Sequence, residues 1–118
     1  MNYILVFLGG GIGSILRYGL SQGLKRFNFD FPLATLLANG LSCVLLGFTL
    51  SLFSNQSISE QQKLLLITGV CGGFSTFSTF TNETFLLAQN GNLFLAISNI
   101  FINLLFCFVC LFIGMKLS

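Results

Sequence analysis

Apolar residues fill four long stretches of the chain, and short polar segments separate them. The stretches cover approximately residues 3–20, 32–53, 62–88 and 93–115. Each is close to the ~20 residues that an α-helix needs to cross a hydrocarbon core. None shows the polar–apolar alternation that is typical of a membrane-spanning strand. The pattern therefore predicts an all-α membrane protein, with residues 1–118 forming a single domain of four transmembrane helices.

The composition agrees with this interpretation. Hydrophobic residues make up 54% of the chain and charged residues only 7%, whereas a soluble domain normally carries about 25% charged residues. So few charges cannot cover a water-facing surface, and the net charge of +2 is too small to indicate a nucleic-acid partner. All four cysteines lie in apolar stretches, so we expect them to be small packing residues.

Basic residues are nearly balanced between the two ends of the predicted bundle. Lys63 and Lys116 fall on the side of the N-terminus, whereas Lys25 and Arg26 fall on the other, with Arg17 near them. The positive-inside rule therefore gives almost no preferred orientation. Either another feature sets one orientation, or the chain inserts both ways and oppositely oriented copies pair. Four helices are also too few to surround a polar pathway, so a transport function implies an oligomer.

The third stretch contains the sequence GVCGGFSTFSTFTNE at residues 69–83. Gly72 and Gly73 weaken a helix by about 1 kcal/mol each relative to alanine, and the hydroxyl residues that follow compete for backbone hydrogen bonds. Non-helical backbone at membrane depth is tolerated only inside protein or along a cavity. A break here frees carbonyl oxygens, which suit a small cation. The alternative is an unbroken helix with small residues at a packing seam.

Isolated polar residues occur in the other apolar stretches. Asn39, Asn99 and Asn103 each need a partner inside a membrane, either across a helix contact or along a watery path. Arg17 is either an interfacial anchor or an electrostatic aid to an anion. Glu83 is the only acid inside a predicted membrane helix, and it either pairs with a cation such as Arg17 or has a function.

Phe77 and Phe80 are three positions apart and therefore share one helix face. The edge of an aromatic ring carries partial positive charge, so a pair of ring edges offers weak polarity to a small anion. A strongly cationic site would hold such an ion too tightly for conduction.

These residues together resemble the CrcB/Fluc family of small fluoride channels. The resemblance covers nearly the whole chain, and its most specific part is GVCGGFSTFSTF, with Ser75 in place of a threonine. Further matching positions are Gly9, Gly10, Gly13, Arg17, Tyr18, Phe31, Pro32, Thr35, Leu36, Asn39 and Gly47. At positions 99 and 103 this chain has asparagines where the family commonly shows a tyrosine and a serine.

The resemblance implies an antiparallel, dual-topology dimer with a break in the third helix, two fluoride pores and a structural sodium ion at its centre. The backbone carbonyls of Gly72 and Ser75 would hold the sodium ion. Phe77 and Phe80 would face the pore, with Arg17 and Glu83 near its vestibule. Donors along the path would come from Asn39, Ser78, Thr79, Asn99 and Asn103. The second subunit would be an inverted copy of this chain or a paralogous chain.

The function that follows from the resemblance is passive, fluoride-selective export that lowers cytoplasmic fluoride, by a multi-pass protein of the bacterial plasma membrane. No enzymatic activity is expected. A proton-coupled exporter of the small multidrug type is the main alternative, disfavoured because the chain lacks histidine and has one membrane acid, Glu83. A third possibility is a structural subunit of a larger membrane complex.

Overall fold

The computed structural model describes residues 1–28 and 30–117, and four helical spans in this part of the chain are long and apolar enough to cross a membrane. The first, second and fourth are single α-helices. The third is composed of several successive segments. The bounds are α1 Asn2–Lys25, α2 Leu33–Ser54, α3 Glu60–Lys63, the π-helical η1 Leu64–Cys71, α4 Gly72–Phe74, α5 Phe77–Gln89 and α6 Leu93–Lys116.

The first helix is longer than the hydrophobic pattern predicted. It was expected to end near residue 20 but continues to Lys25. The residues of this last part are mostly exposed, so their polar side chains end the apolar stretch without ending the helix. Hydropathy therefore marked the end of the apolar stretch, and the helix extends beyond it.

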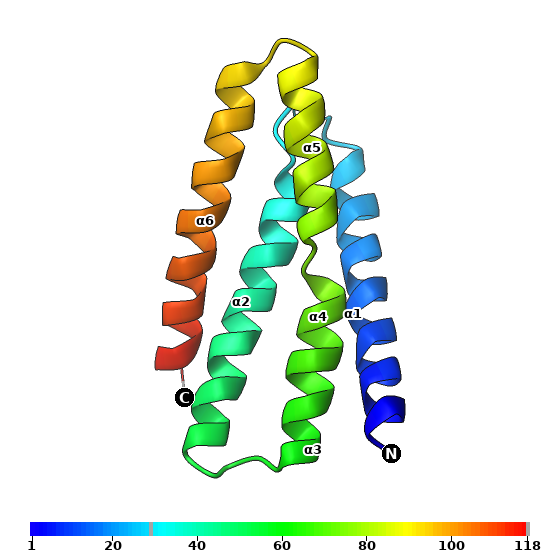
Figure 1. Cartoon of the computed structure of the whole chain (residues 1–118), viewed down its shortest axis with the longest axis vertical. Coiled ribbons are helices and arrows are strands. Elements are labelled where there is room, and N and C mark those ends of the chain that lie inside the picture. Colours follow the sequence, from blue (N-terminus) through cyan, green and yellow to red (C-terminus); the bar gives the residue numbers. More distant parts are fainter. Residues whose placement is uncertain (29, 118) are drawn as a thin grey trace.

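The four spans form an elongated bundle of 49 × 28 × 21 Å. Residue 1, residue 117 and the loop 55–59 lie at one end, whereas residues 26–28, 30–32 and 90–92 lie at the other (Figure 1). α2 packs along α6, α1 packs against η1 and α4, and α5 packs mainly against α6. This arrangement places the middle of the third span between α1 and α2.

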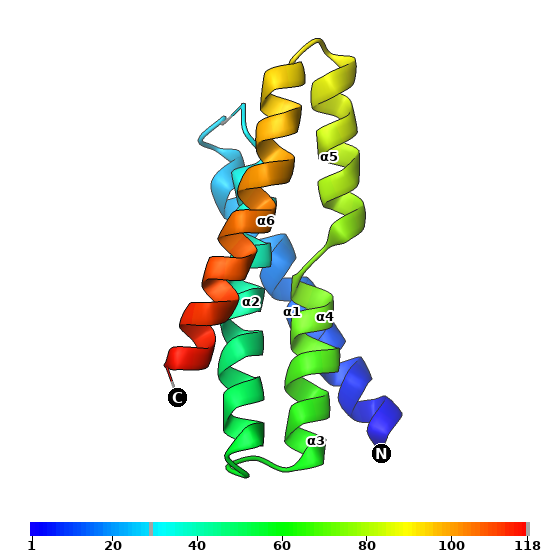
Figure 2. The same cartoon turned by 60° about the vertical axis from the view of Figure 1, so that its left-hand side comes forward.

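The third span changes its backbone geometry near the middle of the bundle. In η1 the backbone is more widely coiled than an α-helix, because its N–H groups bond to carbonyls five residues back. The Gly72 N–H, for example, donates to the Ile67 carbonyl. α4 ends at Phe74, and Ser75 and Thr76 are extended, with ψ of 156° and 122°. α5 then begins at Phe77, and Figure 2 shows this helix displaced from the line of α4. Thr76 caps α5, because its Oγ1 accepts the Thr79 N–H at 3.2 Å.

Glycines allow α1 to approach the third span at backbone distance. A methyl group built on Gly13 would lie 2.7 Å from the Phe74 nitrogen, and one built on Gly69 would lie 2.8 Å from the Gly9 Cα. Contacts this short require something to move. The four-residue spacing of Gly9 and Gly13 therefore serves close helix packing, as small residues at that spacing do in membranes.

Candidate ion pathway

Asn39 on α2 binds the extended segment between α4 and α5. Its Oδ1 accepts the Thr76 N–H at 2.9 Å, and its Nδ2 lies 3.5 Å from the Thr76 carbonyl. Thr76 is only 8% exposed, so water cannot replace these bonds readily. In a continuing α-helix the Thr76 N–H would instead have donated to the Gly72 carbonyl. Asn39 therefore satisfies one residue of the extended segment and leaves the Gly72 oxygen without its helical donor.

A chain of amides continues from Asn39 across α6 to α5. Asn39 Nδ2 donates to Asn103 Oδ1 at 3.4 Å, and Asn103 Nδ2 donates to Asn99 Oδ1 at 2.7 Å. Asn99 Nδ2 in turn donates to Thr84 Oγ1 at 2.8 Å. We call Asn39, Asn103, Asn99 and Thr84 the amide ladder. Asn99 is 0% exposed, so it lies inside the contact between α5 and α6 and bonds across it.

One end of the amide ladder opens on a largely apolar cavity of about 290 Å³ between α2, α5 and α6. The rings of Phe77 and Phe80 line this cavity and lie 5.6 Å apart, with their planes inclined by 46°. The other lining residues are Asn39, Cys43, Asn103, Leu104, Cys107, Phe108 and Leu111. Two amides and a phenylalanine pair therefore border the same space.

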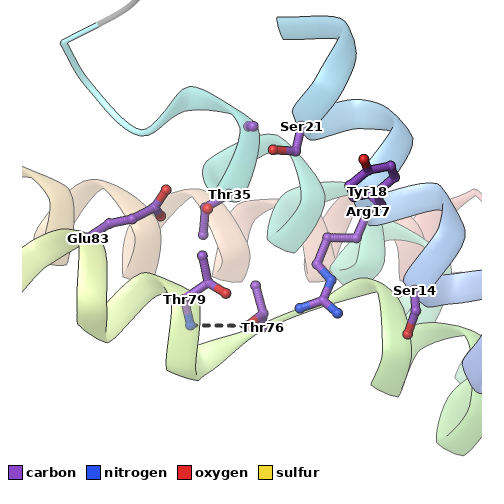
Figure 3. Close-up of a pocket in the computed structure, with 9 residues that line it drawn as sticks. Ser14, Arg17, Tyr18, Ser21, Thr35, Thr76, Thr79 and Glu83 are labelled. Atoms are coloured by element: carbon purple, nitrogen blue, oxygen red, sulfur yellow. Dashed lines mark hydrogen bonds between the residues drawn. The ribbon is translucent and has the colours of Figure 1, made fainter. Parts of the chain in front are cut away.

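A second, more polar cavity of about 220 Å³ lies between α1, α2 and α5. Figure 3 shows Arg17 reaching toward Thr76, and Glu83 facing Thr35 some way along the cavity. Arg17 and Glu83 do not form an ion pair in the described residues 1–28 and 30–117. The buried Oε1 of Glu83 has no hydrogen-bond partner within the same residues. The cavity is completed by Ser14, Tyr18, Ser21, Ala34 and Thr79.

Several residues expected at the site lie on the outside of the single chain. Phe77 is 78% exposed, and Ser78 is exposed beside the Thr76 hydroxyl, at an Oγ–Oγ1 distance of 3.4 Å. Gly72 is also exposed, and a methyl group built on it would meet nothing closer than 3.9 Å. One chain therefore borders the site without enclosing it.

Thr84 is a member of the amide ladder that the sequence analysis did not single out. Its hydroxyl donates to the Phe80 carbonyl at 2.8 Å while accepting from Asn99. The only sequence signal is the four-residue spacing from Phe80, which permits a hydroxyl to bond back to a helix carbonyl. Such spacing is common in membrane helices and carries little information by itself.

Four apolar spans, with the amides of Asn39, Asn99 and Asn103 bonded in the contacts between helices, define a small multi-pass membrane protein. Residues 4–115 match the family described as CrcB-like protein, Camphor Resistance (CrcB). The chain belongs to this family, which confirms the resemblance found in its sequence.

Relatives named fluoride-specific ion channel FluC align with nearly all of the chain. The Pyrococcus horikoshii protein is 44% identical over 115 residues, which cover 97% of this chain and 93% of that protein. The Clostridium perfringens protein is 45% identical over 118 residues, covering 98% and 91%. The Shewanella frigidimarina protein is 42% identical over 117 residues, covering 98% and 94%.

Proposed function

We propose that this chain is a subunit of a passive, fluoride-selective ion channel that releases fluoride from the cell across the bacterial plasma membrane. Membership in the CrcB family and the relatives named fluoride-specific ion channels support this function. The structural observation that carries it is the cavity where Phe77 and Phe80 meet the amides of Asn39 and Asn103. The chain acts as a channel and has no enzymatic role.

The donors around this cavity suit a small anion. Fluoride is strongly hydrated, so a pathway must replace its water with hydrogen-bond donors. The Asn39 N–H groups make only long contacts within the chain, at 3.4 and 3.5 Å, so an anion can compete for them. Amides, hydroxyls and ring edges offer partial positive charge without a full cation, and an ion held in this way is released readily. Thr79 and Ser78 add hydroxyls near the start of α5, and Arg17 adds attraction to the polar cavity.

The working channel is a dimer of oppositely oriented subunits, either two copies of this chain or this chain with a paralogue. The nearly even distribution of basic residues supports insertion in both directions. The exposure of Phe77, Ser78 and Gly72 in one chain supports a second subunit that closes the pathway. Each subunit then provides part of the wall of both pores.

A sodium ion at the centre of this dimer is held by the backbone carbonyls of Gly72 and Ser75. The residues fit such an ion, since the Gly72 oxygen has lost its α-helical donor to Asn39 and Ser75 is extended. Carbonyl oxygens are suitable ligands for a hard cation. Two carbonyls are too few for a complete shell, and an inverted second subunit supplies two more. The ion's role is to join the two interrupted spans.

Fluoride efflux from liposomes tests the function. Purified protein should release fluoride when a potassium ionophore dissipates the opposing voltage. Phe80→Ile should abolish most of this flux, because an aliphatic side chain lacks the positive ring edge. Phe85→Ile is the matched control, since Phe85 lies on the same helix, is 62% exposed and does not line the cavity. If Phe80→Ile and Phe85→Ile give equal fluoride flux, Phe80 does not line the pathway.

The same experiment separates the alternatives. The buried, unpartnered Oε1 of Glu83 is the feature that a proton-coupled exporter would use. Such an exporter requires a proton gradient, whereas a channel requires only the ionophore. A structural subunit of a larger complex gives no flux in either condition.

A further inference from the structure

α5 is held by few contacts within the chain. It contains no buried residue, and α6 is the only helix of the described chain on which it packs extensively. The two helices lie side by side in both views and are joined by the short connection 90–92 (Figures 1 and 2). Lipid tails are as apolar as the side chains, so association in a bilayer depends on packing and on polar bonds. The position of α5 is therefore sensitive to any polar bond that it makes with α6.

The bond between Asn99 and Thr84 is that contact. The single proton of the Thr84 hydroxyl is donated to the Phe80 carbonyl at 2.8 Å, and its lone pair accepts Asn99 Nδ2 at 2.8 Å. The other end of the Asn99 amide accepts Asn103 Nδ2 at 2.7 Å. Both the nitrogen and the oxygen of the Asn99 amide are therefore hydrogen-bonded. Along the connection, Asn99 donates to Thr84, and Thr84 donates to the Phe80 carbonyl.

We propose that Asn99 is a positioning residue that acts through Thr84 to hold the first turns of α5, and with them the Phe80 ring, against the cavity shared with Asn39. Asn99 is fully buried in the α5–α6 contact, so it acts without touching the ion. Fluoride discrimination then depends on where this bond places the ring edge. The proposal rests on the proposed fluoride pathway and assigns a role to a residue that lies outside its wall.

A double-mutant cycle in liposomes tests the link. Asn99→Leu and Thr84→Val should each lower the initial fluoride efflux about tenfold, which corresponds to ~1.4 kcal/mol, and should lower the fluoride-to-chloride rate ratio. The double variant should show no lower fluoride efflux than the more impaired of the two single variants. Thr81→Val is the matched control, because Thr81 makes the same 2.8 Å bond to the carbonyl four residues back but has no partner on α6. It should keep wild-type flux.

Two further measurements distinguish positioning from a general loss of structure. Exchanging the pair, with Asn99→Thr and Thr84→Asn together, restores a donor and an acceptor and should recover the selectivity ratio. Amide hydrogen exchange over residues 79–84 in lipid nanodiscs should be faster in both single variants and unchanged in Thr81→Val. This exchange measurement does not require transport, so it still decides the proposal if the wild-type protein fails to conduct fluoride.

The proposal is overturned if Thr84→Val, purified at wild-type yield, shows wild-type flux, selectivity and exchange. It is also overturned if Thr81→Val causes the same changes as Thr84→Val, because the effect would then come from loss of any back-bonded hydroxyl on α5. Failure of the exchanged pair to recover the ratio, with both single variants impaired, would assign the residues a structural role only.

Discussion

Replacing Asn39 by leucine should destabilise the extended segment of the third span. Leucine has similar size but no polar atoms, so the substitution removes the 2.9 Å bond from the Thr76 N–H and the longer contacts at 3.4 and 3.5 Å. Packing volume is nearly conserved, and the effect therefore reports the hydrogen bonds.

The magnitude follows from the burial of Thr76. A neutral hydrogen bond contributes about 1 kcal/mol net, and leaving one buried partner unsatisfied costs about 1–3 kcal/mol. Thr76 is 8% exposed, so its N–H cannot recover a full bond to water. The two longer contacts are near the limit of hydrogen bonding and add little. We expect a total loss of about 2–4 kcal/mol in the free energy of unfolding.

Reversible unfolding by detergent in mixed micelles measures this loss, and fluoride efflux from liposomes should fall with it. Asn82→Leu is the control, because Asn82 is exposed on α5 and its side chain makes no hydrogen bond within the described residues. Equal stability of the two leucine variants would show that the Asn39–Thr76 bond does not hold the extended segment, and the reasoning would fail.

Two further predictions concern packing and the central ion. Gly13→Ala should destabilise the chain by about 1–3 kcal/mol, because the added methyl group overpacks against Phe74 and Val70. Gly19→Ala, where a methyl group meets nothing within 4 Å, should be neutral or stabilising. Equal melting temperatures of the two variants would contradict this prediction. If the proposed dimer holds a sodium ion and working Na⁺ is about a hundredfold above its Kd, replacing Na⁺ by N-methylglucamine should weaken that dimer by on the order of 2–3 kcal/mol. The mass measured by light scattering and the melting temperature should both change with Na⁺. If neither does, Gly72 and Ser75 do not hold a sodium ion.

The sequence was most informative where the local chemistry is unusual. Four apolar stretches predicted the four spans, because the bilayer fixes their length and polarity. The glycines and hydroxyls of residues 69–83 pointed to a weak helix, and the chain is extended at Ser75 and Thr76. The end of the first helix was missed, because polar side chains at an interface do not end helical backbone bonding.

The partners of the buried amides could not be predicted from the sequence. Spacing placed Asn99 and Asn103 on one helix face, but it left open whether they bond across helices or face a path. The answer depends on how α2, α5 and α6 approach one another, which is a property of the packed bundle. In the structure Asn99 bonds to Thr84, and Asn103 both bonds to Asn99 and borders the apolar cavity.

Most backbone groups around the extended segment already have hydrogen-bond partners, and the carbonyl that lacks one marks the place for an ion. The Cys71 carbonyl accepts from Ser42 at 3.1 Å and from Ser75 at 2.8 Å, and the Thr76 backbone is bonded to Asn39. Within the described residues, no hydrogen bond reaches the Gly72 carbonyl, which belongs to an exposed residue on the outer face of the chain. An unsatisfied carbonyl at membrane depth costs several kcal/mol, so a partner is required there. The cation proposed to be shared with a second subunit would meet that requirement, and the stability of each interrupted span would then depend on assembly of the proposed dimer.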